Sequence, residues 1–296
     1  MAMIVSWVIP LEMVGNHVTY FTSLVFWAVP IALLLCRLYH QTDPGSRRRR
    51  AFWLSTAFIF VAGVVLDFLL GSWILRFDDD PTHKTYLYRF PFGQRIPLEE
   101  VLFYFMGGMA ILLVYFWADE YWMSAYNRRQ RRTNAELPIE SGWKLIRFSP
   151  HVLVWAILLL LAGFAMKWWR TGSAWPPPLY FSFLVFVSIV PAIAVARDVS
   201  KVVNWRAFSF TCLYVLITSC IWEVTLGLPG SWWWYREPPA MMNWYLRPFS
   251  LAAARPYPIE ALLVWLVVSF DSIFAYEFLK GITYEPRGVK VALFGE

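Results

Sequence analysis

Seven runs of apolar residues, each about as long as the hydrocarbon core of a bilayer, set the narrowest limit on how this chain folds. A helix needs roughly 17–25 consecutive apolar residues to cross that core. The runs cover residues 18–38, 51–75, 98–118, 150–166, 179–197, 207–227 and 257–279. Only 16% of the 296 residues are charged, whereas soluble domains carry about 25%. The sequence therefore predicts an all-α, polytopic membrane protein of about seven transmembrane helices, with residues 1–296 in a single membrane domain.

The loops between these runs differ in charge, and the difference predicts how the helices are oriented. With the N-terminus outside, the inner loops hold 17 of the 26 Lys and Arg residues and the outer loops hold nine. An excess of basic residues marks the cytoplasmic side of a membrane protein. We therefore expect a multi-pass protein of the cell membrane with its N-terminus outside and its C-terminus in the cytoplasm. Because the net charge of +6 arises in these short loops, we expect no nucleic-acid partner.

Cysteine, histidine and clustered aspartate residues do not form the patterns of a metal or disulfide site. Cys36, Cys212 and Cys220 lie in apolar runs without metal-ligand spacing. The four histidines are scattered, so the clustered boxes of a di-iron enzyme are absent. Residues 78–80 are aspartates followed by a proline, and no second aspartate-rich motif accompanies them as a prenyltransferase would require. The sequence therefore predicts no metal and no cofactor.

The two halves of the chain share a pattern of acidic residues that predicts an internal repeat. In the first half, Asp67 lies four residues before a glycine, and an aromatic loop leads to a Pro-x-Glu motif that contains Glu99. In the second half, Glu223 lies four residues before a glycine, and an aromatic loop leads to the Pro-x-Glu motif of Glu260. The two acids are 32 residues apart in the first half and 37 in the second.

This pattern predicts two three-helix repeats, residues 18–118 and 179–279, joined by a linker helix over residues 150–166. Because one helix lies between the repeats, both copies have the same orientation, and both Pro-x-Glu motifs begin helices at the same face of the membrane. We therefore expect the acids of both halves to face one cavity. The outer segments 76–97 and 228–256 are rich in aromatic residues and long enough to fold over the bundle.

The position of the acids suggests acid–base chemistry inside the membrane. Asp67 and Glu223 lie within apolar runs, where a carboxylate is costly unless it is neutral, paired or directed into a cavity. Glu99, Glu100 and Glu260 follow prolines that suit the first turn of a helix, where an alternative role is to complement the helix dipole. Neighbouring buried acids can divide the roles of general acid and general base. Aromatic faces stabilise a developing cation, and excluding water protects it. Protonation of an alkene followed by carbocation cyclisation needs all of these features.

The best-preserved copy of the motif lies over residues 96–104, where Pro-x-Glu-Glu is followed by Phe103 and Tyr104. This segment resembles the membrane lycopene cyclases of the heterodimeric actinobacterial and fused archaeal or fungal type. Their hallmark is Pro-x-Glu-Glu followed by aromatic residues, once in each three-helix half. The resemblance covers residues 51–118 and 207–279. It departs from the family in the second motif, where Ala261 replaces the second acid.

The resemblance implies a redox-neutral cyclase that acts on an acyclic carotenoid such as lycopene and forms ionone-type end rings. The expected partners are thus a lipophilic polyene or isoprenoid substrate and the lipid bilayer. The expected catalytic residues are the acids Glu99, Glu100, Asp67, Glu223 and Glu260. The expected substrate-binding residues are the aromatics Trp73, Phe103, Tyr104, Trp232 and Tyr257.

Other functions fit parts of the same pattern. A cyclase or other acid–base enzyme for a different isoprenoid would use the same acids. A transporter or a non-catalytic polyene-binding protein would use Asp67 and Glu223 as proton or ion relays. A retinal-type pigment needs a lysine in mid-membrane, whereas Lys280 lies at the end of the last run. Asp271, also in that run, faces either the cavity or a neighbouring helix. The ring type, the roles of the individual acids and the oligomeric state, including a homo-oligomer, stay open.

Overall fold

The computed structural model describes residues 19–42, 46–71, 74–77, 86–88, 95–126, 150–173, 175–228, 232–235, 241–246 and 257–284. The α-helices within these residues are α2 (Tyr20–Gln41), α3 (Arg47–Leu66), α5 (Leu98–Trp117), α7 (Pro150–Thr171), α8 (Leu179–Leu184), α9 (Val190–Val199), α10 (Trp205–Trp222) and α12 (Ile259–Tyr284). Four π-helical turns continue or join them: Asp67–Gly71, Ala118–Trp122, Val185–Ile189 and Glu223–Gly227. A 3₁₀ turn (Ser124–Tyr126) and four short strands, β1 (Leu75–Arg76), β2 (Tyr86–Tyr88), β3 (Arg95–Pro97) and β4 (Trp234–Tyr235), complete the described elements.

Seven of the described helical segments are long and apolar enough to cross a membrane, which confirms the predicted all-α, multi-pass fold. One of them consists of α8, the turn Val185–Ile189 and most of α9. Large apolar side chains cover the outward faces of the bundle; Phe26 is 69% exposed, Leu33 67% and Leu161 59%. Soluble monomers rarely expose apolar patches of this extent. These faces are therefore suited to lipid contact.

Side-chain caps and one proline determine where several helices begin. Thr19, Ser46 and Asn204 each precede a helix, and each side-chain oxygen accepts a hydrogen bond from the amide three residues further on. This bond satisfies a donor that the first turn leaves free. Pro97 occupies the same position before α5 with an extended backbone. Its missing N–H costs nothing there, and the motif that follows falls in the first turn of the helix.

The helices differ from the predicted runs at their ends. The linker helix α7 was expected over 150–166 but continues to Thr171. The charged residues Lys167 and Arg170 end the apolar run in the sequence, but they lie within the last turns of the helix. The buried Lys167 ammonium donates to the backbone carbonyl of Pro176, so its charge has a partner. The run 51–75 becomes α3 together with the turn Asp67–Gly71, and it starts earlier, within the basic residues 47–50.

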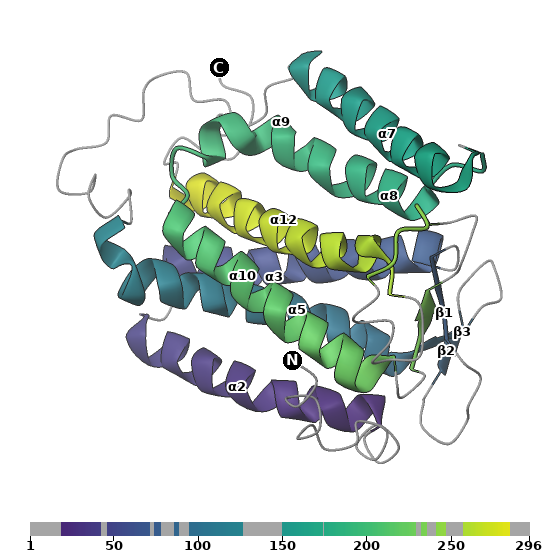
Figure 1. Cartoon of the computed structure of the whole chain (residues 1–296). Helices are drawn as coiled ribbons and strands as arrows, with labels where there is room; N and C mark the ends of the chain where they lie inside the picture. Colours follow the sequence, from purple (N-terminus) through teal and green to yellow (C-terminus); the bar gives the residue numbers. More distant parts are fainter. Residues whose placement is uncertain are drawn as a thin grey trace, which may run out of the picture.

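Helix α12 lies at the centre of the bundle and packs against α3, α5, α9 and α10 (Figure 1). Helix α2 packs against α5, and α7 lies at the edge against α8 and α9. The largest group of buried apolar side chains lies between α2, α3, α5, α10 and α12, and includes Phe52, Leu112, Phe116 and Ile273. The core thus joins helices of the first and second halves of the chain.

Short strands connect the two halves at one end of the bundle. Strand β1 pairs in antiparallel fashion with β4, so that Leu75 lies opposite Tyr235 and Arg76 opposite Trp234. Strands β2 and β3 pair just before α5 begins, and Figure 1 shows all four strands at the same end. Because β1 follows Asp67 and β4 follows Glu223, this pairing brings the acid-bearing ends of α3 and α10 to the same end of the molecule.

Candidate active site

A cavity of about 510 Å³ lies between the two halves. Its wall comes from α3, α5, α8, α9, α10 and α12 and is mostly apolar. Four acidic side chains interrupt that wall: Asp67, Glu100, Glu223 and Asp271. The cavity is within the size range of small-molecule binding sites, which combine apolar walls with a few polar groups.

Asp67 and Glu223 occupy equivalent positions in the two halves. Each is the first residue of a five-residue π-helical turn that continues a membrane-spanning helix and ends at a glycine. A π-helical turn inserts an extra residue into a helix, is rare, and is found frequently at functional sites. Both side chains are buried, with 6% and 2% of their surfaces exposed. The two acids that the sequence repeat predicted as equivalent therefore have the same local backbone structure in both halves.

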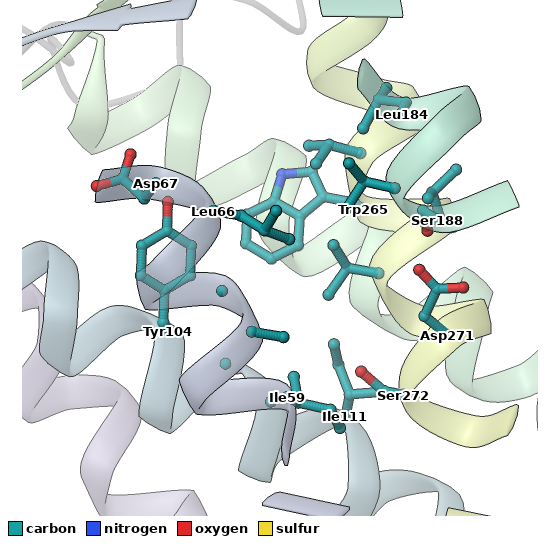
Figure 2. Close-up of a pocket in the computed structure, with 18 of the residues that line it drawn as sticks. Ile59, Leu66, Asp67, Tyr104, Ile111, Leu184, Ser188, Trp265, Asp271 and Ser272 are labelled. Atoms are coloured by element: carbon teal, nitrogen blue, oxygen red, sulfur yellow. The ribbon is translucent and has the colours of Figure 1, made fainter. Parts of the chain in front are cut away.

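Asp67 and Glu100 form the first acidic centre, together with two tyrosines. The Tyr20 hydroxyl on α2 donates to Glu100 Oε2 over 2.7 Å. Tyr104, one turn after Glu100 on α5, interacts with both acids, and Figure 2 shows its hydroxyl directed toward Asp67. The Tyr104 ring lies against Gly63 of α3, where a Cβ atom would be 3.1 Å from it. The close approach of α3 and α5 therefore holds this tyrosine beside both carboxyl groups.

Glu223 forms the second acidic centre and accepts hydrogen bonds on both oxygens. The Tyr235 hydroxyl donates to Oε2 over 2.6 Å, and the Trp265 indole N–H donates to Oε1. The Tyr257 hydroxyl also interacts with Glu223 and lies 3.8 Å from Cys220 Sγ. Burial, followed by the charge of Glu223, raises the pKa of Tyr235 well above its ordinary value, so this hydroxyl keeps its proton at neutral pH.

Aromatic rings form the wall between the two acidic centres. The Phe103 ring stacks on Trp222 at 5.2 Å between centroids and meets Trp265 edge-on at 5.5 Å. Trp222 packs against Trp233 at 5.1 Å. These four rings all line the cavity. The electron-rich ring faces provide the attraction for positive charge that underlies cation–π contacts.

Tyr180, which the sequence analysis did not identify, lines the cavity near both acidic centres. It interacts electrostatically with Asp67, Glu100 and Glu223, and its ring stacks on Tyr235 at 6.5 Å. Within the described part of the chain, the contacts of Tyr180 are electrostatic or between rings. Tyr180 follows three prolines at the start of α8, away from the acidic repeat. No sequence motif identified Tyr180. The available signal was a lone tyrosine near the start of a helix in a bundle that contains several acids.

Two of the predicted acids are buried beside the cavity and are not among its described lining residues. Glu99 is 5% exposed and sits next to Glu100 in the first turn of α5. Glu260 is fully buried, and its Oε1 accepts a hydrogen bond from the Met242 amide. These two are the equivalent glutamates of the two Pro-x-Glu motifs. Glu260 thereby holds the backbone at Met242 against the start of α12, whereas the Glu99 Oε2 atom has no hydrogen-bond partner among the described residues.

Of the predicted aromatic residues, some line the cavity and others are buried beside it. Phe103 and Tyr104 line the cavity. Trp232 stacks on Tyr20 at 5.2 Å, and so supports a residue that holds Glu100. Tyr257 is completely buried beside Glu223. Trp73 lies outside the described residues, as do the aspartates 78–80.

A second group of buried charges lies at the opposite ends of α5 and α12. Lys280 Nζ is 3.1 Å from Glu277 Oε1 and 3.7 Å from Asp119 Oδ2. The Tyr115 hydroxyl donates to Glu277 Oε1 over 3.3 Å. Lys280 is therefore held in an ion-pair network, apart from the cavity. Within the described part of the chain, no group of three or more His, Cys, Asp or Glu residues could hold a metal ion.

Comparisons of the chain with protein-family models, with curated proteins and with solved structures found no significant match. The chemistry of the site is therefore inferred from its own residues. It contains two acidic centres, one from each half, with an aromatic wall between them and an apolar cavity in front of both. Such a site can transfer protons to and from a hydrophobic molecule.

Proposed function

We propose that this chain is a membrane-bound cyclase of the lycopene type, which closes a ring at the end of an acyclic polyene by proton-initiated chemistry. The observation that supports this most directly is that Asp67, Glu100 and Glu223, contributed by both halves, line one apolar cavity. The resemblance of residues 96–104 to the membrane lycopene cyclases agrees with it.

The reaction needs one proton donor and one proton acceptor and no redox partner. A carboxylic acid protonates the terminal double bond of the polyene and leaves a cation on the more substituted carbon. The electron pair of a double bond further along the chain forms the ring bond to that carbon, and the positive charge moves to the ring. A carboxylate then removes a proton from a carbon next to the new cation. Substrate and product therefore have the same atoms and the same oxidation level.

The two acidic centres suit these two roles. Asp67 and Glu100 both interact with Tyr104, and two neighbouring carboxyl groups in a poorly solvated site share a proton because they do not ionise together easily. We assign the proton donor to this pair. Glu223 receives hydrogen bonds from Tyr235 and Trp265, which stabilise its carboxylate form. We assign the proton acceptor to Glu223.

The surroundings protect the cation and admit a hydrophobic substrate. The Phe103, Trp222 and Trp265 rings face the cavity between the two centres and stabilise positive charge there. Phe58 of α3 lines the cavity and is 60% exposed on the lipid-facing side. Pro191 of α9 also lines the cavity and is exposed. We infer that the polyene reaches the acids from the bilayer, between α3 and α9.

Expression in cells that accumulate lycopene tests the proposal. We expect the wild-type chain to convert lycopene into ring-bearing carotenoids, detected by chromatography of the extracted pigments. Asp67→Asn, Glu100→Gln and Glu223→Gln should each lower the yield by about 100-fold or more, because each removes a proton-transfer group.

Glu120→Gln is the matched control for these variants. Glu120 forms an ion pair with Arg48 at 2.9 Å and is not among the described residues of the cavity wall. Its variant should retain wild-type yield. An unchanged lycopene profile in cells whose membranes contain the wild-type chain would rule out the proposed function. Full activity of Asp67→Asn would rule out the role of Asp67.

We also propose that the protein lies in the cell membrane with its N-terminus outside and its C-terminus in the cytoplasm. The distribution of basic residues, 17 in the inner loops and nine in the outer loops, supports this orientation. The strand pairs and both acidic centres would then lie toward the outer face. A green fluorescent protein fused to the C-terminus should fluoresce, and alkaline phosphatase fused there should be inactive. The opposite pair of results would reverse the orientation.

A further inference from the structure

The cavity is a long groove that runs away from the acidic centres along helix α12. Its lining residues on α12 extend from Val264 to Leu279 at helical spacing, so they form one face of that helix. This face is about 22 Å long, at 1.5 Å per residue. Trp265, at its start, donates to Glu223, so the groove begins at the acids. It covers about two-thirds of the hydrocarbon core of a bilayer, which is roughly 30 Å thick.

The groove lies between helices that pack against α12 on either side. Helices α3 and α9 both pack against α12, and both contribute lining residues. Figure 2 shows Asp67 and Ile59 of α3 on one side of the cavity and Asp271 of α12 on the other. On α3 the lining ends at Phe58, nine residues before Asp67, which is about 13 Å along the axis. The part of the groove beyond Phe58 is therefore walled chiefly by α9 and α12.

The end of the groove away from the acids is closed by apolar packing. Val195 of α9 and Phe274 and Phe278 of α12 line the groove. The same three side chains belong to the apolar cluster that joins α9 to α12. The groove therefore has one end with acids and one closed apolar end.

Between these two ends the wall presents mostly carbon. Ser188 and Ser272 are lining residues, but each of their hydroxyl oxygens exposes less than 1 Å². Asp271 is the only acid of the described lining beyond the two acidic centres. A membrane-spanning helix tolerates an acid that faces a cavity. The middle and far parts of the groove are thus suited to a hydrocarbon.

We propose that this groove binds the hydrocarbon chain of a linear polyene, extended along α12 with one end at the acidic centres. The substrate class is then an acyclic hydrocarbon with an extended chain of at least about 22 Å, the length of the lining face of α12. Which end of the chain reacts rests on the proposed function, because the acids mark that end. Binding of the chain itself requires no reaction.

This arrangement explains how a chain longer than the groove is held. Phe58 and Pro191 line the groove and are exposed on the lipid-facing side. The rest of a longer chain therefore extends into the bilayer between α3 and α9. Only one end of the polyene reaches the acids at a time, so a molecule with two reactive ends must leave and bind again in the opposite direction to form a second ring.

Induced circular dichroism of lycopene, added to the purified protein in detergent, tests the groove without requiring turnover. Lycopene is achiral and absorbs visible light, so it gives no visible circular dichroism in micelles and acquires it when a chiral site holds it. We expect a signal with the wild-type chain that saturates at equimolar lycopene. The signal should disappear when the pigment is extracted into solvent.

Two substitutions on different helices should block the groove. Ala275 lies on α12, eleven residues after Val264, or about 16 Å along the axis. Gly107 lies on α5, and a Cβ atom there meets nothing within 4 Å. Ala275→Trp and Gly107→Leu should each lower the signal at least about fivefold, because the larger side chain occupies the space of the polyene. Both variants should keep the far-ultraviolet spectrum of the wild type.

Ala165→Trp is the matched control for these two variants. Ala165 of α7 is exposed and is not among the described lining residues, so its variant should keep the full signal. Squalene and farnesene, two acyclic isoprenoid hydrocarbons, test the length of the groove. Squalene fills it, whereas farnesene is shorter and leaves the far wall without contacts. Squalene should halve the lycopene signal at a concentration at least about fivefold lower than farnesene does.

Three results would overturn the groove: no signal with the wild type, a signal that survives in either blocked variant, or equal competition by squalene and farnesene. Ring formation from lycopene together with any of these results would overturn the groove alone. A signal that both blocking substitutions remove, without ring formation, would support the groove and reject the proposed reaction.

Discussion

At the scale of single residues, Tyr235 is the hydrogen-bond donor whose removal tests Glu223 most directly. Its hydroxyl donates to Glu223 Oε2 over 2.6 Å, and its raised pKa keeps it protonated at neutral pH. Tyr235→Phe removes this donor and keeps the ring. Hydrogen bonds to charged groups contribute about 1.5–3 kcal/mol, so we expect cyclisation to fall by about 10- to 100-fold, measured as ring-bearing product per amount of protein.

Tyr245→Phe is the control for that change. The Tyr245 hydroxyl donates to Asn243 Oδ1 over 3.2 Å, and Tyr245 is not one of the described cavity residues. Its variant should form product at the wild-type rate. Equal rates for both variants would show that the Tyr235 bond does not support the reaction.

At this scale, the sequence showed which acids lie in apolar runs but not how their side chains are oriented in the bundle. Asp67 and Glu223 were predictable because a carboxylate in an apolar run needs a cavity or a partner. Glu99 and Glu100 were equally good candidates, yet only Glu100 faces the cavity. Successive helical residues point about 100° apart, and the rotation of α5 is set by its packing against α2, α3 and α12. That packing is long-range, so the motif alone did not distinguish the two.

At the scale of elements, the turn Glu223–Gly227 depends on the absence of a side chain at its last residue. A Cβ atom at Gly227 would lie 2.3 Å from the Trp233 ring, which lines the cavity and packs on Trp222. Gly227→Ala therefore displaces Trp233 or opens the turn. We expect a loss of about 1–3 kcal/mol in the free energy of unfolding, as for other overpacked sites, and a blue or red shift of the tryptophan emission.

Gly107→Ala is the matched control for this glycine. Gly107 lies in the middle of α5, and a Cβ atom there meets nothing within 4 Å. Alanine in a helix interior is favoured over glycine by about 1 kcal/mol, so this variant should be as stable as the wild type or more stable. If Gly227→Ala unfolded at the wild-type temperature with unchanged emission, the close packing of Trp233 on the turn would be refuted.

The helices themselves were predictable and their irregularities were not. Apolar run length gave all seven spans, since the bilayer imposes that length on every one of them. The π-helical turns at Asp67 and Glu223 each insert an extra residue near the end of a helix, which the hydropathy pattern does not record. The sequence did mark their last residues, because each acid precedes a glycine by four positions.

At the scale of the whole molecule, two long-range contacts hold the halves together at opposite ends of the bundle. At the site end, β1 of the first half pairs with β4 of the second. At the other end, Lys280 of α12 pairs with Asp119, which follows α5. Neither contact was predictable, because each joins segments more than 150 residues apart in the chain. The expectation of one shared cavity followed instead from the parallel orientation of the two halves.

The buried ion pairs at the far end predict a large effect of one substitution. Lys280 and Asp119 side chains are each only 4% exposed, so Lys280→Met leaves Asp119 and Glu277 without that cation in a poorly solvated site. Removing one partner of a buried ion pair typically costs about 3–5 kcal/mol. We expect the free energy of unfolding in mixed detergent micelles, followed by circular dichroism, to fall by about that amount.

Two further variants separate charge from packing in this prediction. Arg48→Met removes a cation whose own side chain is 42% exposed, with a partner, Glu120, that is 6% exposed. It should cost less than Lys280→Met, because both side chains of the Lys280–Asp119 pair are buried. Adding Asp119→Asn and Glu277→Gln to Lys280→Met removes the charges left uncompensated, so the triple variant should recover much of the lost stability. If Lys280→Met were no less stable than Arg48→Met, the network would not hold the halves together. A triple variant as unstable as Lys280→Met alone would show that the uncompensated carboxylates of Asp119 and Glu277 are not the cause of the lost stability.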